Sequence, residues 1–332
     1  MSRCACHRGP KAAHRVECGG KAKRRRRFGL PPRIWDSHSR GFEVEAFPKH
    51  IYFWEMKDAQ LPAVTTFRAL HESGCFVLPN PWDVGTAIYL EHLGFKALAT
   101  TSAGFAFSRG KPDGGVSLDE MLRHVGEIAA ATTLPVNADF LNGFAHEPEA
   151  VATNTNLCIT QGAAGLSIED NTGNSAAPLY EKELAIDRIR AARRAVDDSG
   201  IPVVLTGRCE AWLVGSTDPL RVVLERLTSY AEAGADCLYA PGVREPNEIE
   251  QIVKAVAPKP VNVLVSGFNC ELTLSQLADL GARRISVGSG LALAAWGAFI
   301  RAAQTIQKDG VFNLLAQNAA SAELNERFRG KS

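Results

Sequence analysis

One pattern of apolar and polar positions repeats along the chain from about residue 62 onward. A stretch of helical character ends at a glycine, and a short apolar run follows within a few residues, as at 93–99, 161–166, 233–239 and 280–287. Glycine is favoured just beyond a helix because it accepts the left-handed conformation that closes the last turn. The pattern therefore predicts helices that alternate with short buried strands.

Eight apolar runs have the length of strands, and the segments between them are long enough for helices. Such alternation produces right-handed crossovers and a parallel sheet. Eight units favour closure into a (β/α)8 TIM barrel, an α/β fold, with a doubly wound open sheet as the alternative. The expected strands lie at 75–79, 97–101, 135–139, 165–169, 203–207, 237–240, 261–265 and 284–288.

The last expected barrel helix differs from the seven before it. Residues 291–300 are apolar nearly all round. A helix without a polar face is buried on every side, so we expect this one to pack against another subunit. The expected helices lie near 83–93, 117–132, 147–161, 181–198, 217–233, 245–256, 273–280 and 289–307.

The first 55 residues lack this pattern and form a basic leader, with 13 Lys and Arg against 5 Asp and Glu. Such a segment is typical of a disordered tail, a targeting signal or a nucleic-acid arm. Alternatively, the natural protein starts at Met56 and has no leader. We therefore expect the leader at 1–55, a catalytic barrel at 56–308 and a helical tail at 309–332.

Charge and cysteine content narrow the class of protein. Residues 56–332 hold 24 Lys and Arg against 31 Asp and Glu, and this mildly acidic balance argues against nucleic-acid binding by the barrel. No apolar run approaches the ~18–20 residues of a membrane span. The eight cysteines show no paired framework, which indicates reduced thiols and a cytoplasmic protein.

Charged residues stand at the carboxyl ends of three successive expected strands. Asp139 ends the third strand, Glu169 the fourth and Arg208 the fifth, and these ends meet at the active-site face of a barrel. Two carboxylates repel unless a proton or cation lies between them, and oxygen ligands suit Mg²⁺ or Mn²⁺. Alternatively, the acids are solvated or cap helices, and Arg208 pairs structurally with Glu169 or Glu210.

Three further segments belong to the same face. Residues 100–104 form a turn of small residues whose backbone N–H groups can hold an oxyanion, although any tight turn has this composition. Gly288-Ser289-Gly290 is typical of a barrel phosphate cup or of a tight turn into the next helix. The polar loop 171–178 is either a lid over the substrate or a surface connection.

In order and at barrel spacing, eight segments between about residues 66 and 305 resemble the isocitrate lyase/phosphoenolpyruvate mutase superfamily. Together they are far more specific than any one alone. The segments are Asn80-Pro81-Trp82-Asp83-Val84-Gly85-Thr86-Ala87, Thr101-Ser102-Ala103-Gly104, Pro112-Asp113-Gly114, Asn137-Ala138-Asp139-Phe140, Ser167-Ile168-Glu169-Asp170, Gly207-Arg208, Tyr239-Ala240-Pro241-Gly242 and Pro260-Val261-Asn262-Val263.

The resemblance implies a Mg²⁺-dependent enzyme that cleaves or rearranges a C–C or C–P bond of a small 2-oxo or 2-hydroxy carboxylate through an enolate. The activities it implies are those of phosphoenolpyruvate mutase, carboxyphosphonoenolpyruvate mutase, phosphonopyruvate hydrolase and oxaloacetate decarboxylase. It also implies a homodimer or homotetramer in which the last barrel helix is exchanged between subunits. That exchange would account for the apolar helix at 291–300.

The resemblance also implies where the substrate binds. By position, Ser102, Ala103 and Gly104 would hold the substrate carboxylate or its oxyanion. Arg208 matches the carboxylate clamp, and Asn262 matches a polar position on the seventh strand. These five residues form the expected substrate-binding set.

Catalytic and metal-binding roles follow from the same resemblance, with two departures from the family pattern. Asp113 matches an acid beside the reacting centre, and Asp139 and Glu169 match the metal shell. The usual Asp-x-Asp metal motif begins here with Asn137, whose amide oxygen can coordinate Mg²⁺ but contributes no charge, so the metal is expected to bind more weakly or through water. Moreover, the loop 171–178 lacks the cysteine motif of the lyases, which argues against a true isocitrate or methylisocitrate lyase.

Two alternatives to the enolate-forming enzyme stay open. The chain could be a phosphate-binding barrel aldolase that uses the turn 288–290, although no lysine ends an expected strand, as a Schiff-base aldolase requires. It could instead be a catalytically inactive barrel that binds a metabolite or a partner, a reading kept open by Asn137 and the missing cysteine. Metal-dependent turnover separates the enzymes from the inactive barrel.

Overall fold

Eight parallel strands form a nearly closed barrel in this computed structural model, which describes residues 49–267 and 271–329, with side chains from residue 60 onward. The strand order is β1-β8-β7-β6-β5-β4-β3-β2. Ala99 N donates to Pro79 O at 3.0 Å and so links β2 to the end of β1. The strands are β1 (Phe76–Leu78), β2 (Leu98–Ala99), β3 (Val136–Asp139), β4 (Gly165–Glu169), β5 (Val204–Arg208), β6 (Cys237–Tyr239), β7 (Val261–Leu264) and β8 (Arg284–Ser286).

Helices separate the strands, and several begin with residues that stabilise the start of a helix. Ser117 and Glu120 form a capping box at the start of α4, and proline occupies the first turn of α5, α7 and α8, where its missing N–H is not needed. The helices are α1 (Lys49–Leu70), α2 (Val84–His92), α3 (Ser102–Ser108), α4 (Leu118–Ala131), α5 (Pro148–Thr160), α6 (Lys182–Ser199), α7 (Pro219–Glu232), α8 (Pro246–Val256), α9 (Leu274–Asp279), α10 (Gly290–Asp309), η1 (Asn313–Gln317) and α11 (Ser321–Phe328).

The barrel predicted from the sequence is confirmed, and each of its eight expected strands overlaps an observed one. The eight expected helices correspond to α2 and to α4 through α10. The sequence did not indicate α1 or α3. Residues 1–48 of the expected leader lie outside the described residues, and the expected boundary at residue 56 falls inside α1. The division into leader, barrel and tail stays a prediction.

Helix α1 covers the amino-terminal ends of the strands. Phe67 is fully buried and lies so close to Gly165, at the start of β4, that a Cβ there would be 2.7 Å from its ring. Gln60 Nε2 donates to Ala163 O at 2.7 Å, just before the same strand. This end of the barrel is therefore closed, which leaves the carboxyl ends of the strands for the site.

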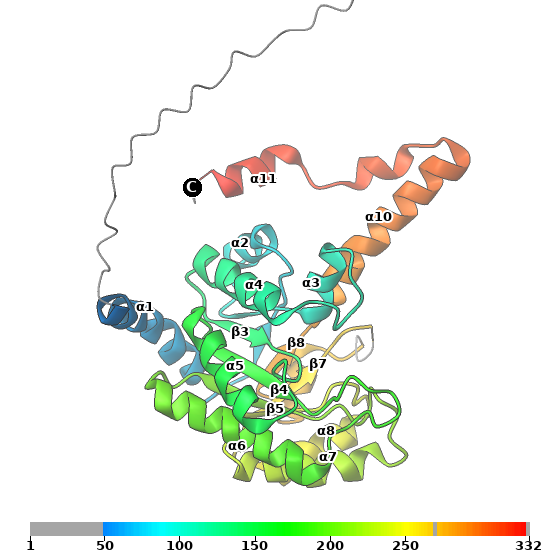
Figure 1. The fold of residues 1–332 in the computed structure, drawn as a ribbon. Helices are drawn as coiled ribbons and strands as arrows, with labels where there is room; N and C mark the ends of the chain where they lie inside the picture. The colour runs from blue at the N-terminus through cyan, green and yellow to red at the C-terminus, as the bar shows by residue number, and fades with distance from the viewer. Residues whose placement is uncertain (1–48, 268–270, 330–332) are drawn as a thin grey trace, which may run out of the picture. The chain divides into compact units, whose positions relative to one another are not determined.

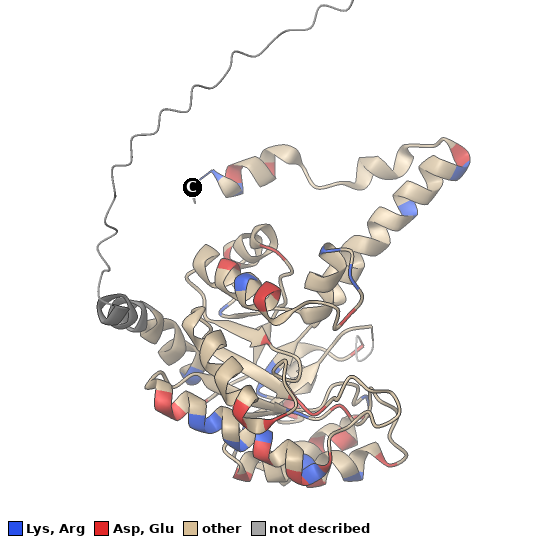
Figure 2. Ribbon diagram, viewed as in Figure 1, with Lys and Arg blue, Asp and Glu red and all other residues tan. Residues whose placement is uncertain are grey.

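Helix α10 leads away from the strands, and η1 and α11 continue beyond it (Figure 1). Charged side chains cover α6 and α7 but are few on α10 (Figure 2). The barrel of the same chain does not bury α10, because several large apolar side chains of this helix are exposed. These side chains are Leu291, Leu293, Trp296, Phe299 and Ile300.

The tail returns toward the barrel through α11. Tyr89 Oη of α2 donates to Glu323 Oε1 at 2.7 Å, so α11 lies beside α2. Within the described ranges, no helix has the length and apolar character needed to cross a membrane.

Candidate active site

A cavity of about 290 Å³ opens at the carboxyl ends of the strands, on the face where catalytic residues lie in (β/α)8 barrels. Most of its polar side chains come from strand ends or from the first residues after a strand. They are Asn80, Thr101, Ser102, Asp113, Asn137, Asp139, Ser167, Arg208, Tyr239, Asn262, Ser266, Arg284, Ser286 and Ser289.

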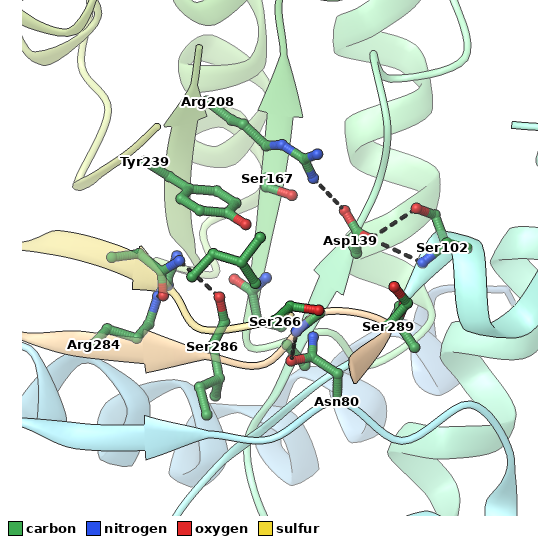
Figure 3. A pocket seen from close by; sticks show the side chains of 18 of the residues that line it. Asn80, Ser102, Asp139, Ser167, Arg208, Tyr239, Ser266, Arg284, Ser286 and Ser289 are labelled. Atoms are coloured by element: carbon green, nitrogen blue, oxygen red, sulfur yellow. Dashed lines mark hydrogen bonds and ion pairs between the residues drawn. The ribbon is translucent and has the colours of Figure 1, made fainter. Parts of the chain in front are cut away.

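Asp139 is held in place by residues that follow β2. Ser102 donates to Asp139 Oδ2 through both its backbone N and its Oγ, each at 2.8 Å. Thr100 Oγ1 accepts a hydrogen bond from Asp139 N at 2.9 Å. Figure 3 shows Ser102 and Asp139 joined on one side of the cavity. The neighbouring strands β2 and β3 thus fix one carboxylate oxygen.

Arg208 joins three carboxylates across β3, β4 and the end of β5. Its Nη1 lies 3.1 Å from Asp139 Oδ1 and 3.3 Å from Glu169 Oε2, and its Nε lies 2.6 Å from Glu210 Oε1. The guanidinium also stands over the ring of Tyr239, 5.1 Å from its centroid. A planar cation with several donors is suited to such bridging. Arg208 both pairs with these acids and lines the cavity. The structural pairing and the substrate-binding role considered for it from the sequence are therefore compatible.

The charges of this cluster do not balance. One guanidinium faces three carboxyl groups, and burial, opposed by Arg208, raises the pKa of Glu169 well above its usual value. Burial likewise raises the pKa of Glu210. Burial opposes the charge of Arg208, but Glu169 and Glu210 nevertheless raise its pKa. A cluster with excess negative charge favours uptake of a proton or a cation.

Glu169 Oε2 in this cluster is suited to a hard divalent cation, whereas Asn137 Oδ1 lies toward Gly165 at the start of β4, where a Cβ would be 2.8 Å from it. The buried Asn137 Oδ1 has no hydrogen-bond partner, and neither does Glu169 Oε2, whose contact with Arg208 is an ion pair without hydrogen-bond geometry. Mg²⁺ is commonly held by one or two carboxylates together with water and substrate. Among the described residues no group of three His, Cys, Asp or Glu side chains has metal-ligand spacing, so a cation at this cluster would also need oxygen atoms from water or substrate.

Three predicted substrate-binding residues open α3, directly after β2. Ser102 and Ala103 line the cavity. Thr101 caps the helix by accepting from Gly104 N at 3.2 Å. Gly104 itself does not line the cavity, because the place of its missing Cβ faces Thr101, Ala292 and Trp82. Its smallness lets α3 pack closely against α10.

Asp113 and Asn262 also line the cavity, from opposite sides of the barrel. Asp113 lies in the exposed segment before α4. Its partial burial, and then the nearby Asp139 charge, raise its pKa. Asn262 is buried on β7, accepts from Arg284 Nε at 2.9 Å and donates to Ser286 Oγ at 2.9 Å. The structure therefore brings both predicted residues to one cavity.

Asp170 and the turn 288–290 have structural roles. Asp170 is buried behind the cavity, where it accepts from Tyr230 Oη at 2.7 Å, Arg226 Nη1 at 3.0 Å and Glu210 N at 2.8 Å, so it positions Glu210. In the turn 288–290, Gly288 N donates to Asn80 Oδ1 at 2.8 Å. That donor of the possible phosphate cup is thus already in use.

Several cavity residues were assigned no role from the sequence. Tyr239 belongs to one of the segments that resemble the superfamily. Burial raises its pKa to about 12, so it presents a neutral hydroxyl to the cavity. Arg284 and Ser286 come from β8. A signal for them existed, because residues two apart on a strand point to the same side, and both share the inward face.

The chain matches the profile of one protein family and is similar in sequence to characterised enzymes. The profile of the phosphoenolpyruvate phosphomutase family matches residues 67–307. The chain is 32% identical over 258 residues to 2-methylisocitrate lyase of Escherichia coli strain K12, covering 74% of this chain and 81% of that enzyme. It is 28% identical over 217 residues to oxaloacetate decarboxylase of Rhodopseudomonas palustris strain BisB5, covering 64% of this chain and 72% of that enzyme.

A solved structure is similar over a larger share of the chain. A protein of Burkholderia cenocepacia J2315, provisionally described as a lyase/mutase, superposes with a TM-score of 0.79 at 45% identity and covers 82% of this chain and 98% of its own. The family profile covers the whole barrel from the end of α1 to α10. The chain therefore belongs to the phosphoenolpyruvate phosphomutase family, whose members are lyases or phosphomutases of the isocitrate lyase/phosphoenolpyruvate mutase superfamily.

Proposed function

We propose that this protein cleaves or rearranges a C–C or C–P bond of a small 2-oxo or 2-hydroxy carboxylate through an enolate, with Mg²⁺ as cofactor. The observation that carries the proposal is the contact of Arg208 with Asp139, Glu169 and Glu210 at the cavity. The names of relatives such as oxaloacetate decarboxylase support a substrate of this class. Mn²⁺ is an acceptable replacement because it takes the same oxygen ligands.

The chain's own residues divide the work between two walls of the cavity. Arg208 orients the substrate carboxylate, because a guanidinium fork matches two carboxylate oxygens. The hydroxyl and backbone N–H of Ser102 donate to Asp139 Oδ2 in this structure. They become donors to a substrate oxygen when that oxygen takes the place of Asp139 Oδ2. Such preorganised donors are typically the largest catalytic contribution.

Asp139 and Glu169, assisted by Asn137, are the proposed metal ligands. Mg²⁺ bound there would supply positive charge to the oxygens of the substrate where the enolate charge develops. Asp113 is the proposed acid–base group or guide for the leaving fragment. Its raised pKa moves it toward the range in which a carboxyl group exchanges protons near neutral pH.

A coupled assay of product release tests the proposal. Pyruvate formed from oxaloacetate, and pyruvate or phosphoenolpyruvate formed from phosphonopyruvate, would be measured with Mg²⁺ and with EDTA, after subtraction of the enzyme-free rate. We expect metal-dependent turnover and a loss of about 10²- to 10³-fold in kcat for Asp139→Ala, comparable to removal of one preorganised group.

Asp187→Ala is the matched control, because Asp187 forms an exposed ion pair with Arg190 on α6 far from the cavity lining. It should keep wild-type activity. Turnover that persists in EDTA would refute the metal role, and equal rates for Asp139→Ala and wild type would refute the site.

A catalytically inactive barrel is the second candidate, and Asn137 favours it. The amide replaces a charged oxygen that the family motif usually provides, so the metal site offers the cation one negative charge fewer. Asn137→Asp decides between the two. Turnover that appears only in this variant would show that the wild-type barrel has lost catalysis.

We also propose a cytoplasmic homodimer or homotetramer. The exposed apolar face of α10 supports association with a second copy, with exchange of that helix between subunits. The four cysteines at positions 75, 158, 209 and 237 are free thiols, which agrees with a reducing compartment.

A further inference from the structure

We propose that Arg284 forms a second anion-binding subsite, which selects substrates with a carboxylate or phosphonate group at the end opposite the reacting carboxylate. The inference takes the 2-oxo or 2-hydroxy acid of the proposed function as its starting point. Oxaloacetate and phosphonopyruvate both carry a second anionic group, and the inference names the residue that recognises it.

Arg284 is a buried cation at the wall of the cavity. It is the first residue of β8, is 2% exposed and lines the cavity. Its Nε donates to Asn262 Oδ1 at 2.9 Å, and its Nη2 donates to Thr206 Oγ1 at 3.1 Å. Both acceptors are uncharged.

The third contact of Arg284 is also neutral. Its Nη1 lies 3.3 Å from His71 Nε2. Burial first, and then the Arg284 charge, lower the pKa of His71 to about 3, so this imidazole is uncharged at neutral pH. His71 Nδ1 lies 2.7 Å from Phe67 O and must carry the proton to bond that carbonyl. Nε2 is then the free lone pair that accepts from Arg284.

Arg284 therefore has no carboxylate partner among the described residues. This is unusual, because buried charges are normally paired. Arg208 contacts three carboxylates and Arg226 contacts Asp170 at 3.0 Å. Arg188 also lacks an acid, but it is satisfied by backbone carbonyls and does not line the cavity. Arg284 combines an unbalanced charge with access to bound ligand.

The cavity is divided by charge into two sides. Figure 3 shows Asp139 and Ser102 on one side and Arg284 and Ser286 on the other. Around the barrel, at least two strands separate β3 from β8, and three separate it from β7. Asn262 and Ser286, hydrogen-bonded to each other at 2.9 Å, add neutral polar groups beside Arg284.

This division fits a ligand with one anionic group for each side. A 2-oxo or 2-hydroxy carboxylate at the Asp139 side extends toward β8, where a second carboxylate or a phosphonate would supply the missing countercharge of Arg284. Inside a cavity of low dielectric constant such a pair is strong, because little water screens it. A ligand with a methyl group in that position would leave the guanidinium unpaired.

Isothermal titration with three substrate-like acids tests the inference without turnover. The ligands are malate, 2-hydroxy-3-phosphonopropanoate and 2-hydroxybutyrate, which differ only in carrying a carboxylate, a phosphonate or a methyl group at the far end. We expect the wild type in Mg²⁺ buffer to bind at least one dianion about 10- to 100-fold more tightly than 2-hydroxybutyrate, the range for a charge-assisted contact. The preferred dianion identifies the second group.

Arg284→Gln should abolish this preference and leave the affinity for 2-hydroxybutyrate unchanged. Arg284→Lys should retain part of it, because the charge remains. Ser286→Ala, a small change on the same side, should weaken dianion binding several-fold and serves if Arg284→Gln does not fold. If Arg284 had only a structural role, its replacement would instead weaken the binding of all three ligands equally.

Equal affinities of the wild type for the three acids, undetectable binding included, would overturn the inference, and so would an unchanged preference in Arg284→Gln. These outcomes differ from failure of the proposed function. A wild type without turnover that prefers dianions through Arg284 refutes only the proposed reaction. An active enzyme whose preference survives in Arg284→Gln refutes only the subsite.

Discussion

His124 shows what an unpaired polar group costs at the scale of one residue. Its side chain is 3% exposed on α4, its ring stacks on Phe105 with centroids 3.9 Å apart, and its Nε2 has no hydrogen-bond partner. Burial lowers the pKa of His124 to about 4, against a small opposing effect of Asp83. The imidazole is therefore neutral in the folded protein over most of the accessible pH range.

We predict that His124 makes the protein less stable in acid. The unfolded chain takes up a proton near pH 6.5 and the folded one only near pH 4, so this contribution is complete above pH 6.5 and is lost as pH falls toward 4. The loss in the free energy of unfolding is about 3 kcal/mol. Urea unfolding at pH 7 and pH 4 should show a loss of stability about 3 kcal/mol smaller for His124→Phe than for wild type, because His71, whose pKa burial lowers to about 3, and the other titrating groups contribute equally to both.

The exposed His92 of α2 provides the control for that comparison. His92→Phe should follow the wild-type dependence on pH, because the groups that titrate elsewhere are the same in all three proteins. A His124→Phe variant that loses as much stability in acid as wild type would show that the buried histidine does not govern this range.

Single residues of the site were predictable where the sequence carried an interrupted apolar run. Asp139 and Arg208 each end a strand, and parallel strands bring such ends together, so their approach to 3.1 Å follows from the pattern. Arg284 begins its strand, and the two-residue alternation places it on the same face as Ser286, but the local sequence does not show whether that face or the face of Arg283 points into the barrel. Only the closed barrel shows that one of them is buried and lines the cavity.

At the scale of one element, α3 depends on close packing at Gly104. A Cβ added there would lie 2.6 Å from Thr101 Cγ2, 3.1 Å from Ala292 Cβ and 3.3 Å from Trp82 Cβ. Thr101 cannot rotate away without losing its cap on Gly104 N. The added methyl group would therefore displace the start of α3, which carries Ser102 and Ala103 at the cavity.

We predict that Gly104→Ala lowers the free energy of unfolding by about 1 to 3 kcal/mol, the usual effect of overpacking, and reduces product release at least tenfold. Gly85→Ala in α2 is the matched control, since its Cβ would meet ordinary contacts at 3.5 Å or more. It should be neutral or stabilising by up to about 1 kcal/mol. Equal results for both glycines in urea unfolding would contradict this account.

The elements that the sequence did not predict are those without a long pattern. Helix α3 spans 7 residues, too few to show helical periodicity, and its small residues also suit a turn. Helix α1 contains Pro62 and precedes the first strand, so no alternation marks it. The eight strands were predictable because apolar residues and a following helix recur at each.

At the scale of the whole molecule, α10 leaves an apolar surface that one chain does not cover. Phe299 is 62% exposed and Trp296 is 38% exposed, and their rings contact edge to face at 5.5 Å. Beside them lies an apolar groove of about 240 Å³, lined also by Trp82 and Ala295. Large apolar patches of this kind on a protein surface usually mark an interface.

We predict that the wild-type protein sediments at two or four times the 35.8 kDa of the chain, and that Phe299→Asp shifts it to the mass of one chain. A carboxylate placed in a desolvated interface has no partner and opposes association. Analytical ultracentrifugation measures both masses. Leu157→Asp, at a 41% exposed leucine of α5, is the control and should leave the assembly intact. Because α10 packs beside α3 through Ala292 and Gly104, loss of the assembly should also lower product release. A wild type that sediments as a single chain would contradict both the interface and the proposed helix exchange.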